Sequence, residues 1–237
     1  MSKVALVTGS SSGIGAEIAR RLAGDGFHVV VNSRSSVADG EAVAAEIGGS
    51  YLQADVATEG AALVEQVLAA HGRLDVLVNN AGTTEVIPHP DLKAATPEIW
   101  RRLYDVNVIA PFVLVTAAEA ALRAAGGCIV NVSSLAGIRP TGSSIPYAAS
   151  KAAFNHLTRL LAKALAPDVR VNAVAPGLVD TPWTADWHEL RSMVQAFAPM
   201  KRVATPADVA EVVMGLVRAE LLTGEVIVLD SGMSLLP

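Results

Sequence analysis

The feature of the sequence that most restricts the fold is a regular alternation of short apolar runs with longer periodic segments. Runs of strand length lie at residues 4–9, 27–32, 50–55, 74–80, 127–134, 169–177 and 225–232. Between them, segments with helical periodicity cover residues 14–24, 37–47, 59–71, 97–124, 147–166 and 206–219. Strands joined by helical crossovers form parallel sheets. The pattern predicts an α/β fold: a doubly wound, seven-stranded parallel sheet in a three-layer α/β/α arrangement.

The composition agrees with one domain that is packed mainly by aliphatic side chains. Of the 237 residues, 51% are hydrophobic but only 4% are aromatic, as expected for strands covered by helices on both faces. No composition break or Gly/Ser linker divides the chain, so residues 1–237 are predicted to form a single domain. The formal charge is −5 and the basic residues are scattered, which favours neither nucleic acid nor a membrane as a partner.

The cysteine content and the absence of targeting signals suggest where the protein works. Cys128 is the only cysteine, which excludes an internal disulfide and a thiolate metal cluster, and no metal site is predicted. Three residues precede the first apolar run, too few for a signal peptide, and no apolar run approaches the length of a membrane span. We expect a cytoplasmic protein in a reducing compartment.

A glycine-rich turn follows the first predicted strand. The segment TGSSSGIG occupies residues 8–15 and leads into an Ala-rich helical segment. Its glycines would let a pyrophosphate approach the helix N-terminus, where free N–H groups and the positive end of the helix dipole attract anions. Glycine-rich turns also occur without a ligand, because glycine readily adopts positive φ. The strand–turn–helix context, without the lysine of a P-loop, favours a dinucleotide over a triphosphate.

The end of the second predicted strand bears on the choice of cofactor. It reads NSRS, so Ser33 and Arg34 stand where an NAD enzyme would hold the ribose 2′-hydroxyl with an acidic side chain. An arginine at this place suits a 2′-phosphate, although a solvated loop arginine is the alternative interpretation. Ser12 is neutral where a second basic residue would strengthen the case. The sequence favours NADP(H) over NAD(H).

Polar and small residues also follow the third and fourth predicted strands. Asp55 could accept a hydrogen bond from an adenine amino group, or cap the next helix. Asn79 and Asn80 could form an Asx turn, but with Ala81 and Gly82 they also leave space for the adenosine ribose. Ligands of open α/β sheets bind outside the carboxyl ends of the strands, which is where these residues are predicted to lie.

A tyrosine and a lysine stand four residues apart in the segment YAASK, at Tyr147 and Lys151. Helical neighbours at i and i+4 share a face, so the ammonium is predicted to lower the pKa of the phenol from its usual value near ~10. Such a phenol can give a proton to a carbonyl oxygen that receives a hydride. A surface pair is the alternative, but the segment is apolar nearly all round, which indicates burial.

Two further candidates for catalysis lie upstream. Ser133 and Ser134 end the fifth predicted strand, where a hydroxyl could bond a substrate carbonyl and the tyrosine, or simply form a turn. Asn107 lies within the helical segment 97–124, although asparagine is a poor helix former. It could bind a water molecule or kink the helix.

Taken in order, the motifs TGSSSGIG, NNAG, Asn107, VSS, YAASK and PGLVDT resemble those of the single-domain short-chain dehydrogenase/reductase family over essentially the whole chain. The resemblance implies a Rossmann fold and chemistry like that of 3-oxoacyl carrier-protein reductases. It implies Ser134 as the hydroxyl that orients the carbonyl and Tyr147 as the acid/base. It implies Lys151 as both the pKa-lowering cation and a ligand of the nicotinamide ribose, and Asn107 as the holder of a proton-relay water.

The resemblance also supports NADP(H), because members with Ser-Arg at the Ser33 and Arg34 positions are usually NADP(H) users. The sequence departs from the family in lacking the basic residue often found in the glycine turn, and in reading DSG where DGG is frequent after the last strand. Tyr147 and Lys151 are expected to bind the cofactor as well as to act in catalysis. The other expected cofactor-binding residues are Gly9, Ser11, Ser12, Gly13, Ile14, Gly15, Asn32, Ser33, Arg34, Asp55, Val56, Asn80, Ala81, Gly82, Pro176, Gly177, Val179 and Thr181.

The segment after Thr181 is predicted to form a lid. Residues 182–200 contain Trp183, Trp187, Met193 and Phe197, and a short helix with this apolar face would close over the nicotinamide and exclude water. The same residues could instead anchor a surface helix. A lid this apolar suits a lipophilic or acyl-type ketone better than a polyol.

Apolar segments also suggest self-association. The helical segment 147–166 and the C-terminal segment have few polar positions, which is typical of subunit contacts. The resemblance implies a homo-oligomer, either a tetramer or a dimer, with two-fold symmetry.

We therefore expect an NADP(H)-dependent oxidoreductase that acts on a small-molecule ketone or secondary alcohol, with 3-oxoacyl thioester reduction as the leading subclass. Enoyl reductases of related fold space their tyrosine and lysine further apart, which argues against double-bond reduction. The alternatives are an NAD-dependent dehydrogenase of a sugar, steroid or other secondary alcohol, and a non-catalytic nucleotide-binding regulator. The intact Ser134, Tyr147 and Lys151 argue against the regulator, while the identity of the substrate cannot be read from the sequence.

Overall fold

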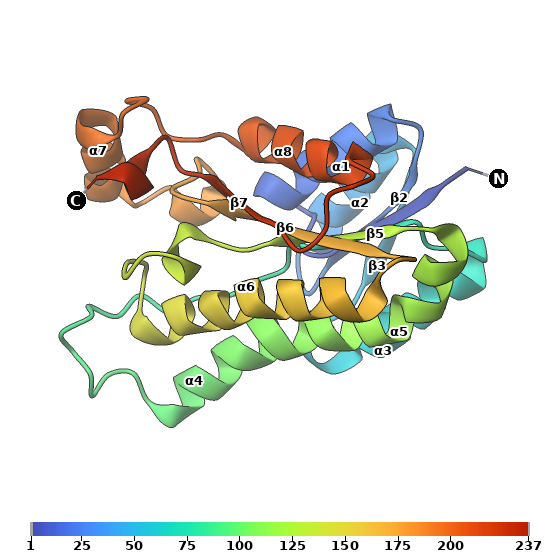
Figure 1. Ribbon diagram of the computed structural model, residues 1–237, viewed down its shortest axis with the longest axis horizontal. Coiled ribbons are helices and arrows are strands. Elements are labelled where there is room, and N and C mark those ends of the chain that lie inside the picture. The colour runs from blue at the N-terminus through green and yellow to red at the C-terminus, as the bar shows by residue number, and fades with distance from the viewer. Residues whose placement is uncertain (1, 237) are drawn as a thin grey trace.

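The computed structural model describes residues 2–236 and contains the predicted parallel sheet (Figure 1). Its seven strands lie in the order β3-β2-β1-β4-β5-β6-β7. Their bounds are β1 Val4–Val7, β2 His28–Ser33, β3 Ser50–Gln53, β4 Val76–Asn79, β5 Cys128–Val132, β6 Arg170–Pro176 and β7 Val226–Leu229. The chain starts in the middle of the sheet, runs to one edge through β2 and β3, and returns to place β4 beside β1. The strand order therefore reverses between β1 and β4, where open α/β sheets bind their ligands.

Helices cover both faces of the sheet (Figure 1). One face carries α1 (Gly13–Gly24), α2 (Val37–Ile47) and α8 (Pro206–Arg218). The other carries α3 (Val56–His71), α5 (Ala110–Ala125) and α6 (Ile145–Leu165). The predicted class, a three-layer α/β/α Rossmann fold, is confirmed.

The strands are buried on both sides because alternate side chains enter two separate cores. In β1, Ala5 and Val7 pack in the core under α1 and α8, whereas Val4 and Leu6 pack in the core under α3 and α5. Side chains that alternate across a strand with both faces covered are mostly apolar, and a buried polar exception needs a partner, as Asn131 of β5 has in its 2.9 Å hydrogen bond to the Thr158 hydroxyl. This requirement explains why the strands read as continuous aliphatic runs in the sequence.

The segment predicted as one helix over 97–124 is interrupted in the structure. Helix α4 (Pro97–Tyr104) leads into a π-helical turn, η1 (Asp105–Ile109), and α5 continues from Ala110. A π turn widens the helix by one residue per hydrogen-bonded ring, and such turns are frequent at functional sites. Asn107 lies at the centre of this turn.

The helical segment Pro97–Ala125 is long and apolar enough to cross a membrane, by length and composition only. This finding differs from the expectation that no segment approaches that length. In the structure, Leu114, Ala118 and Leu122 of this segment pack in the core under α3 and the sheet. A core helix passes the same test of length and composition, so the finding is weak evidence for a span.

The predicted short helix within residues 182–200 is present. A 3-10 turn, η3 (Pro182–Thr184), is followed by α7 (His188–Phe197), which stands apart from the sheet at the end of the molecule where the chain terminates (Figure 1). Another 3-10 turn, η4 (Met233–Leu235), lies near it, and a further one, η2 (Leu135–Gly137), follows β5.

Candidate active site

The carboxyl ends of the strands border a crevice of about 1160 Å³. It is lined by the glycine turn, by residues that follow β2 to β6, by the first turns of α6, and by the segment that contains η3 and α7. Every residue that the sequence assigns to the site lines this crevice except Asn107. Residues far apart in the chain are therefore brought together as predicted.

The glycine turn is a backbone cradle that no side chain could enter. Gly9 and Gly13 have φ of 62° and 56°, in the left-handed region that favours glycine. A Cβ on Gly15 would lie 2.5 Å from the carbonyl oxygen of Gly9. The amide of Asn80 donates hydrogen bonds of 2.9 Å to the carbonyl oxygens of Thr8 and Gly9, which fixes the turn.

Helix α1 begins at this cradle with an open N-terminus. Its N-cap, Ser12, makes no side-chain capping bond, and the first turn contains no acidic residue. The N–H groups of Gly13, Ile14 and Gly15 therefore offer partial positive charge to the crevice. A positive helix end beside a bare backbone turn fits the pyrophosphate of a dinucleotide.

Residues after β2 and β3 line the end of the crevice expected to take adenosine. The amide of Asn32 donates to the carbonyl oxygens of Leu52 and Ala54, at 3.1 and 3.2 Å, so it ties β2 to the segment after β3. The hydroxyl of Ser33 is bonded to the Tyr51 hydroxyl, at 2.9 Å. Both polar side chains are hydrogen-bonded within the protein. Recognition of the adenosine at this end therefore falls to the neighbouring residues.

Arg34 and Asp55 are the charged neighbours at this end. The Arg34 side chain is 72% exposed, and its guanidinium lies 3.9 Å from the Asp55 carboxylate. Asp55 also caps α3 by accepting a 3.0 Å hydrogen bond from the N–H of Ala57. The two roles that the sequence left open for Asp55 are thus compatible, since the residue caps a helix and lines the crevice.

Tyr147, Lys151 and Ser134 meet at the floor of the crevice. The hydroxyl of Ser144 caps α6 by accepting a 3.3 Å hydrogen bond from the N–H of Tyr147, which places the tyrosine in the first turn. One turn later, the buried Lys151 donates a 3.0 Å hydrogen bond from Nζ to the carbonyl oxygen of Val132. Its Nζ lies 5.9 Å from the centre of the Tyr147 ring. Ser134, just beyond β5, lies beside the phenol and acts to lower its pKa.

Burial is the largest influence on the pKa of both titratable groups, the Tyr147 phenol and the Lys151 ammonium. It raises the pKa of the Tyr147 phenol, although the hydrogen bond with Ser134 acts in the opposite direction. It also lowers the pKa of Lys151 to about 8. The sequence predicted a lowered pKa for Tyr147, and this direction is wrong for the folded protein. Removing a phenolate from water is unfavourable, and the ammonium lies beside the ring while it bonds the Val132 carbonyl.

Asn107 does not line the crevice, but its side chain joins three elements around it. Nδ2 donates 3.0 Å hydrogen bonds to the carbonyl oxygen of Thr83 and to the hydroxyl of Ser150, and Oδ1 accepts a 2.9 Å bond from the N–H of Thr83. Ser150 donates in turn to the carbonyl oxygen of Tyr147, at 2.7 Å. The distorted helix is observed, whereas the implied proton-relay water stays a prediction.

Sequence reasoning missed Ser144, Ser150 and Thr83. A signal was available for Ser144, because serine at an N-cap followed by proline in the first turn marks the start of a helix. Thr83 contributes through its backbone N–H and carbonyl groups. Almost any residue type could supply these groups, so the sequence gives no signal for this role. The structure also separates the two serines after β5, since Ser133 donates a 2.5 Å hydrogen bond to Asn155 while Ser134 faces the phenol.

The loop after β6 fixes the base of the lid beside the glycine turn. The N–H of Gly177 donates a 2.9 Å hydrogen bond to the carbonyl oxygen of Leu229, and Val179 pairs with Ala204 in an isolated bridge. Thr181 then caps η3 and lies against Gly13, whose added Cβ would be 3.5 Å away. These contacts place Gly177, Val179 and Thr181, which are expected to bind the cofactor, between the cradle and the lid.

Comparisons with known proteins show the family that this chain resembles over nearly its whole length. Residues 9–234 match the profile of a family described as Enoyl-(Acyl carrier protein) reductase. The chain is 53% identical to the "Granaticin polyketide synthase putative ketoacyl reductase 2" of Streptomyces violaceoruber, over 98% of this chain and 96% of that protein.

Solved structures show the same likeness. A crystal structure of a "putative short-chain dehydrogenase/reductase" from Burkholderia xenovorans superposes with a TM-score of 0.92 at 40% identity, over 98% of both chains. The structure titled "ElxO with NADP Bound" superposes with a TM-score of 0.90 at 28% identity, over the full length of both chains. The chain belongs to the short-chain dehydrogenase/reductase family and is an NAD(P)-dependent enzyme that acts on alcohol and carbonyl groups.

Proposed function

We propose that the protein is an NADP(H)-dependent reductase that transfers a hydride from the nicotinamide to a ketone, with 3-oxoacyl compounds as the leading substrate class. The observation that carries the proposal is the cluster of Ser134, Tyr147 and Lys151 at the floor of a crevice whose other end is a backbone cradle. A nicotinamide dinucleotide bound along this crevice supplies the hydride.

The protein's own residues supply the proton and hold the carbonyl. The phenol of Tyr147 keeps its proton at neutral pH, because burial raises its pKa, so it is present as the acid that carbonyl reduction needs. Ser134, which lies beside the same phenol, orients the carbonyl oxygen toward it. When the alcohol forms, Tyr147 gives its proton to the oxygen, and the Lys151 ammonium stabilises the phenolate that is left.

The preference for NADP(H) rests on Arg34 and on the absence of a carboxylate at the end of β2. Arg34 is mostly exposed and is held only by a long contact of 3.9 Å with Asp55, so its guanidinium is available to a 2′-phosphate. The related structure of ElxO contains NADP. An NAD-dependent oxidation of a sugar, steroid or other secondary alcohol is the competing proposal.

Arg34→Ala is expected to raise the KM for NADPH on the order of tenfold to a hundredfold and to leave the KM for NADH nearly unchanged. The reason is the loss of a hydrogen bond to a charged phosphate, which contributes about 1.5–3 kcal/mol. Steady-state kinetics with each cofactor measure the effect, and Arg101→Ala, on the exposed face of α4, is the matched control. An equal change for both cofactors would contradict the assignment.

The substrate class is tested by following NADPH consumption across acyl-thioester, steroid, sugar and small aliphatic ketones. The ketoacyl reductase named among the relatives supports the expectation that a 3-oxoacyl compound is reduced. NADPH consumption that depends on such a ketone is the expected result. A higher kcat/KM with NADH, or no consumption with any ketone, would count against the proposal.

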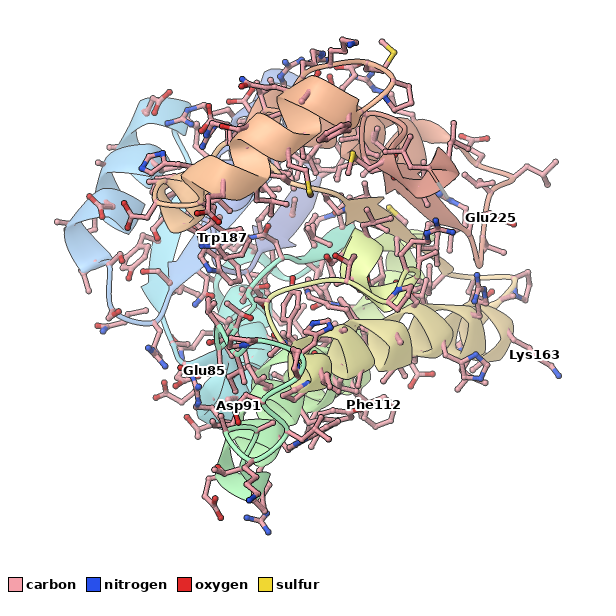
Figure 2. All side chains as sticks on the ribbon, turned by 90° about the vertical axis from the view of Figure 1, so that its left-hand side faces the viewer. Glu85, Asp91, Phe112, Lys163, Trp187 and Glu225 are labelled. Atoms are coloured by element: carbon pink, nitrogen blue, oxygen red, sulfur yellow. The ribbon has the colours of Figure 1, made fainter. Side chains whose placement is uncertain are left out.

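We also propose that the enzyme works in the cytoplasm as a homo-oligomer. Ile109, Phe112 and Val113, on η1 and α5, and Leu160 on α6 are exposed and apolar, and Phe112 points outward from this face (Figure 2). Apolar patches on helical faces of this kind are typical of subunit interfaces. The mass measured in solution by light scattering distinguishes a monomer from a dimer or a tetramer.

A further inference from the structure

We infer that the ketone is uncharged and apolar, and that it enters the crevice free in solution rather than attached to coenzyme A or to an acidic carrier protein. The inference rests on the proposed function and narrows its substrate class. Three features of the substrate half of the crevice carry it: apolar walls, polar groups already paired with one another, and a rim whose charged side chains are carboxylates.

The walls of the substrate half are apolar and come from three separate segments. The lid contributes Trp183, Trp187 and Met193, the loop after β4 contributes Ile87, and η4 contributes Met233. Trp183 is still 51% exposed, so burying it against a ligand would remove much apolar surface from water. Each Å² of apolar surface buried contributes roughly 25 cal/mol, which favours a bulky hydrocarbon body.

Several polar groups that face this half are occupied by each other. The hydroxyls of Thr84 and Ser143 bond one another, and the imidazole of His89 lies 3.1 Å from the carbonyl oxygen of Gly142. The carbonyl oxygen of Ser143 accepts a 2.8 Å hydrogen bond from the N–H of Ile87. A substrate with many hydroxyls would have to break these bonds to be recognised, whereas an apolar ketone needs only Ser134 and Tyr147.

The distribution of charge along the crevice is one-sided. Among the residues between 2 and 236 that line it, the lysines and arginines are Arg34, at the adenosine end, and Lys151, buried at the floor. In the substrate half, the lid contributes the exposed carboxylates of Asp186 and Glu189. Of the described residues that line the substrate half, none is a lysine or arginine at the mouth that could attract an anionic substrate.

Two arginines of neighbouring segments are paired with acids, and Arg139, after β5, donates a 2.6 Å hydrogen bond to the carbonyl oxygen of Leu236. Arg102 bonds Glu85 at 2.5 Å, and Arg191 of the lid bonds Asp180 at 3.0 Å. The loop that carries Glu85 and Asp91 and the lid residue Trp187 lie on the same side of the molecule (Figure 2). The phosphates of coenzyme A or an acidic protein surface would meet the carboxylates of Asp186 and Glu189 at this mouth, which slows productive encounter.

The test uses one 3-oxoacyl chain in two forms, the coenzyme A thioester and the uncharged N-acetylcysteamine thioester, each with saturating NADPH. At about 0.02 M salt, kcat/KM for the neutral form should exceed that for the anionic form, and the gap should narrow as salt rises to about 0.2 M, where charges are screened. The neutral thioester also controls for any effect of salt on the cofactor.

Glu189→Lys is the diagnostic variant, because it reverses the charge at the rim without touching the catalytic floor. It should raise kcat/KM for the coenzyme A thioester about threefold to tenfold at low salt and leave the neutral thioester unchanged. The matched control is Glu220→Lys, which makes the same charge change on an exposed residue that does not line the crevice.

The outcomes distinguish failure of the inference from failure of the proposed function. If the parent enzyme uses the anionic thioester as well as the neutral one at low salt, or if Glu189→Lys has no more effect than Glu220→Lys, the inference is overturned while the proposed function stands. If no ketone in either form supports NADPH oxidation, the proposed function fails and the inference falls with it.

Discussion

Tyr147→Phe is expected to reduce ketone-dependent NADPH oxidation on the order of 10²- to 10⁴-fold, the usual contribution of a positioned acid. The phenylalanine ring fills the same space but has no proton to give to the carbonyl oxygen. Because the glycine cradle and the α1 N-terminus are untouched, the affinity for NADPH should change little. Stopped-flow turnover and fluorescence titration of NADPH measure the two quantities separately.

Tyr104→Phe is the matched control for this variant. Tyr104 ends α4, where its ring packs near Trp100 at a centroid distance of 6.0 Å, and it does not line the crevice. It should retain turnover within a factor of about two, since surface substitutions of this kind have small effects. Parent-like turnover in Tyr147→Phe would show that another group protonates the carbonyl oxygen.

The sheet and the cradle could be predicted because the requirements that shape them act locally. A strand with helices on both faces is mostly aliphatic, and β1 has this pattern throughout. A backbone that passes 2.5 Å from where a Cβ would stand must carry glycine, as Gly15 does. The order of these elements along the chain then limits the topology to few choices, because crossovers between parallel strands are right-handed.

The role of Asn107 could not be predicted, because its partners are remote in the chain. Thr83 and Ser150 lie 24 and 43 residues away, and only the folded chain brings them to the same amide. The π turn follows from the same tertiary contacts, whereas the helical periodicity of residues 97–124 is continuous across it. Helix propensity shows that an asparagine is unfavourable inside a helix, but it does not show which groups the asparagine side chain binds.

The direction of the Tyr147 pKa shift also depends on tertiary structure. Spacing along a helix shows that the phenol and the ammonium share a face, but it does not show how much water each retains. In the structure Lys151 is buried and Tyr147 is partly buried, so desolvation acts on the ammonium and on the phenol alike and disfavours the charged form of each. The catalytic consequence is that Tyr147 is a protonated acid before reaction, and that its phenolate needs support only afterwards.

Lys151→Met tests that support and is expected to lower turnover on the order of 10²- to 10³-fold, as when a preorganised donor to developing charge is removed. Among the described residues at the catalytic floor of the crevice, Lys151 is the one lysine or arginine. Without it, the phenolate of Tyr147 would have no counter-charge there. Methionine has a similar length and suits the apolar surroundings. Lys163→Met, on the exposed side of the same helix, is the control and should leave turnover nearly unchanged (Figure 2).

The same variant has a second readout, in the pH dependence of stability. The pKa of Lys151 falls from 10.5 in the unfolded chain to about 8 in the folded protein. Between these values the unfolded state binds a proton that the folded state has released, so the free energy of unfolding rises with pH, by up to about 3 kcal/mol. The gain is complete above the unfolded pKa and is lost as the pH falls through about 8. Urea unfolding from pH 7 to 10 should therefore show Lys163→Met gaining stability with pH relative to Lys151→Met. Parallel curves would mean that Lys151 is not desolvated, and burial could then no longer account for the acidity of its ammonium.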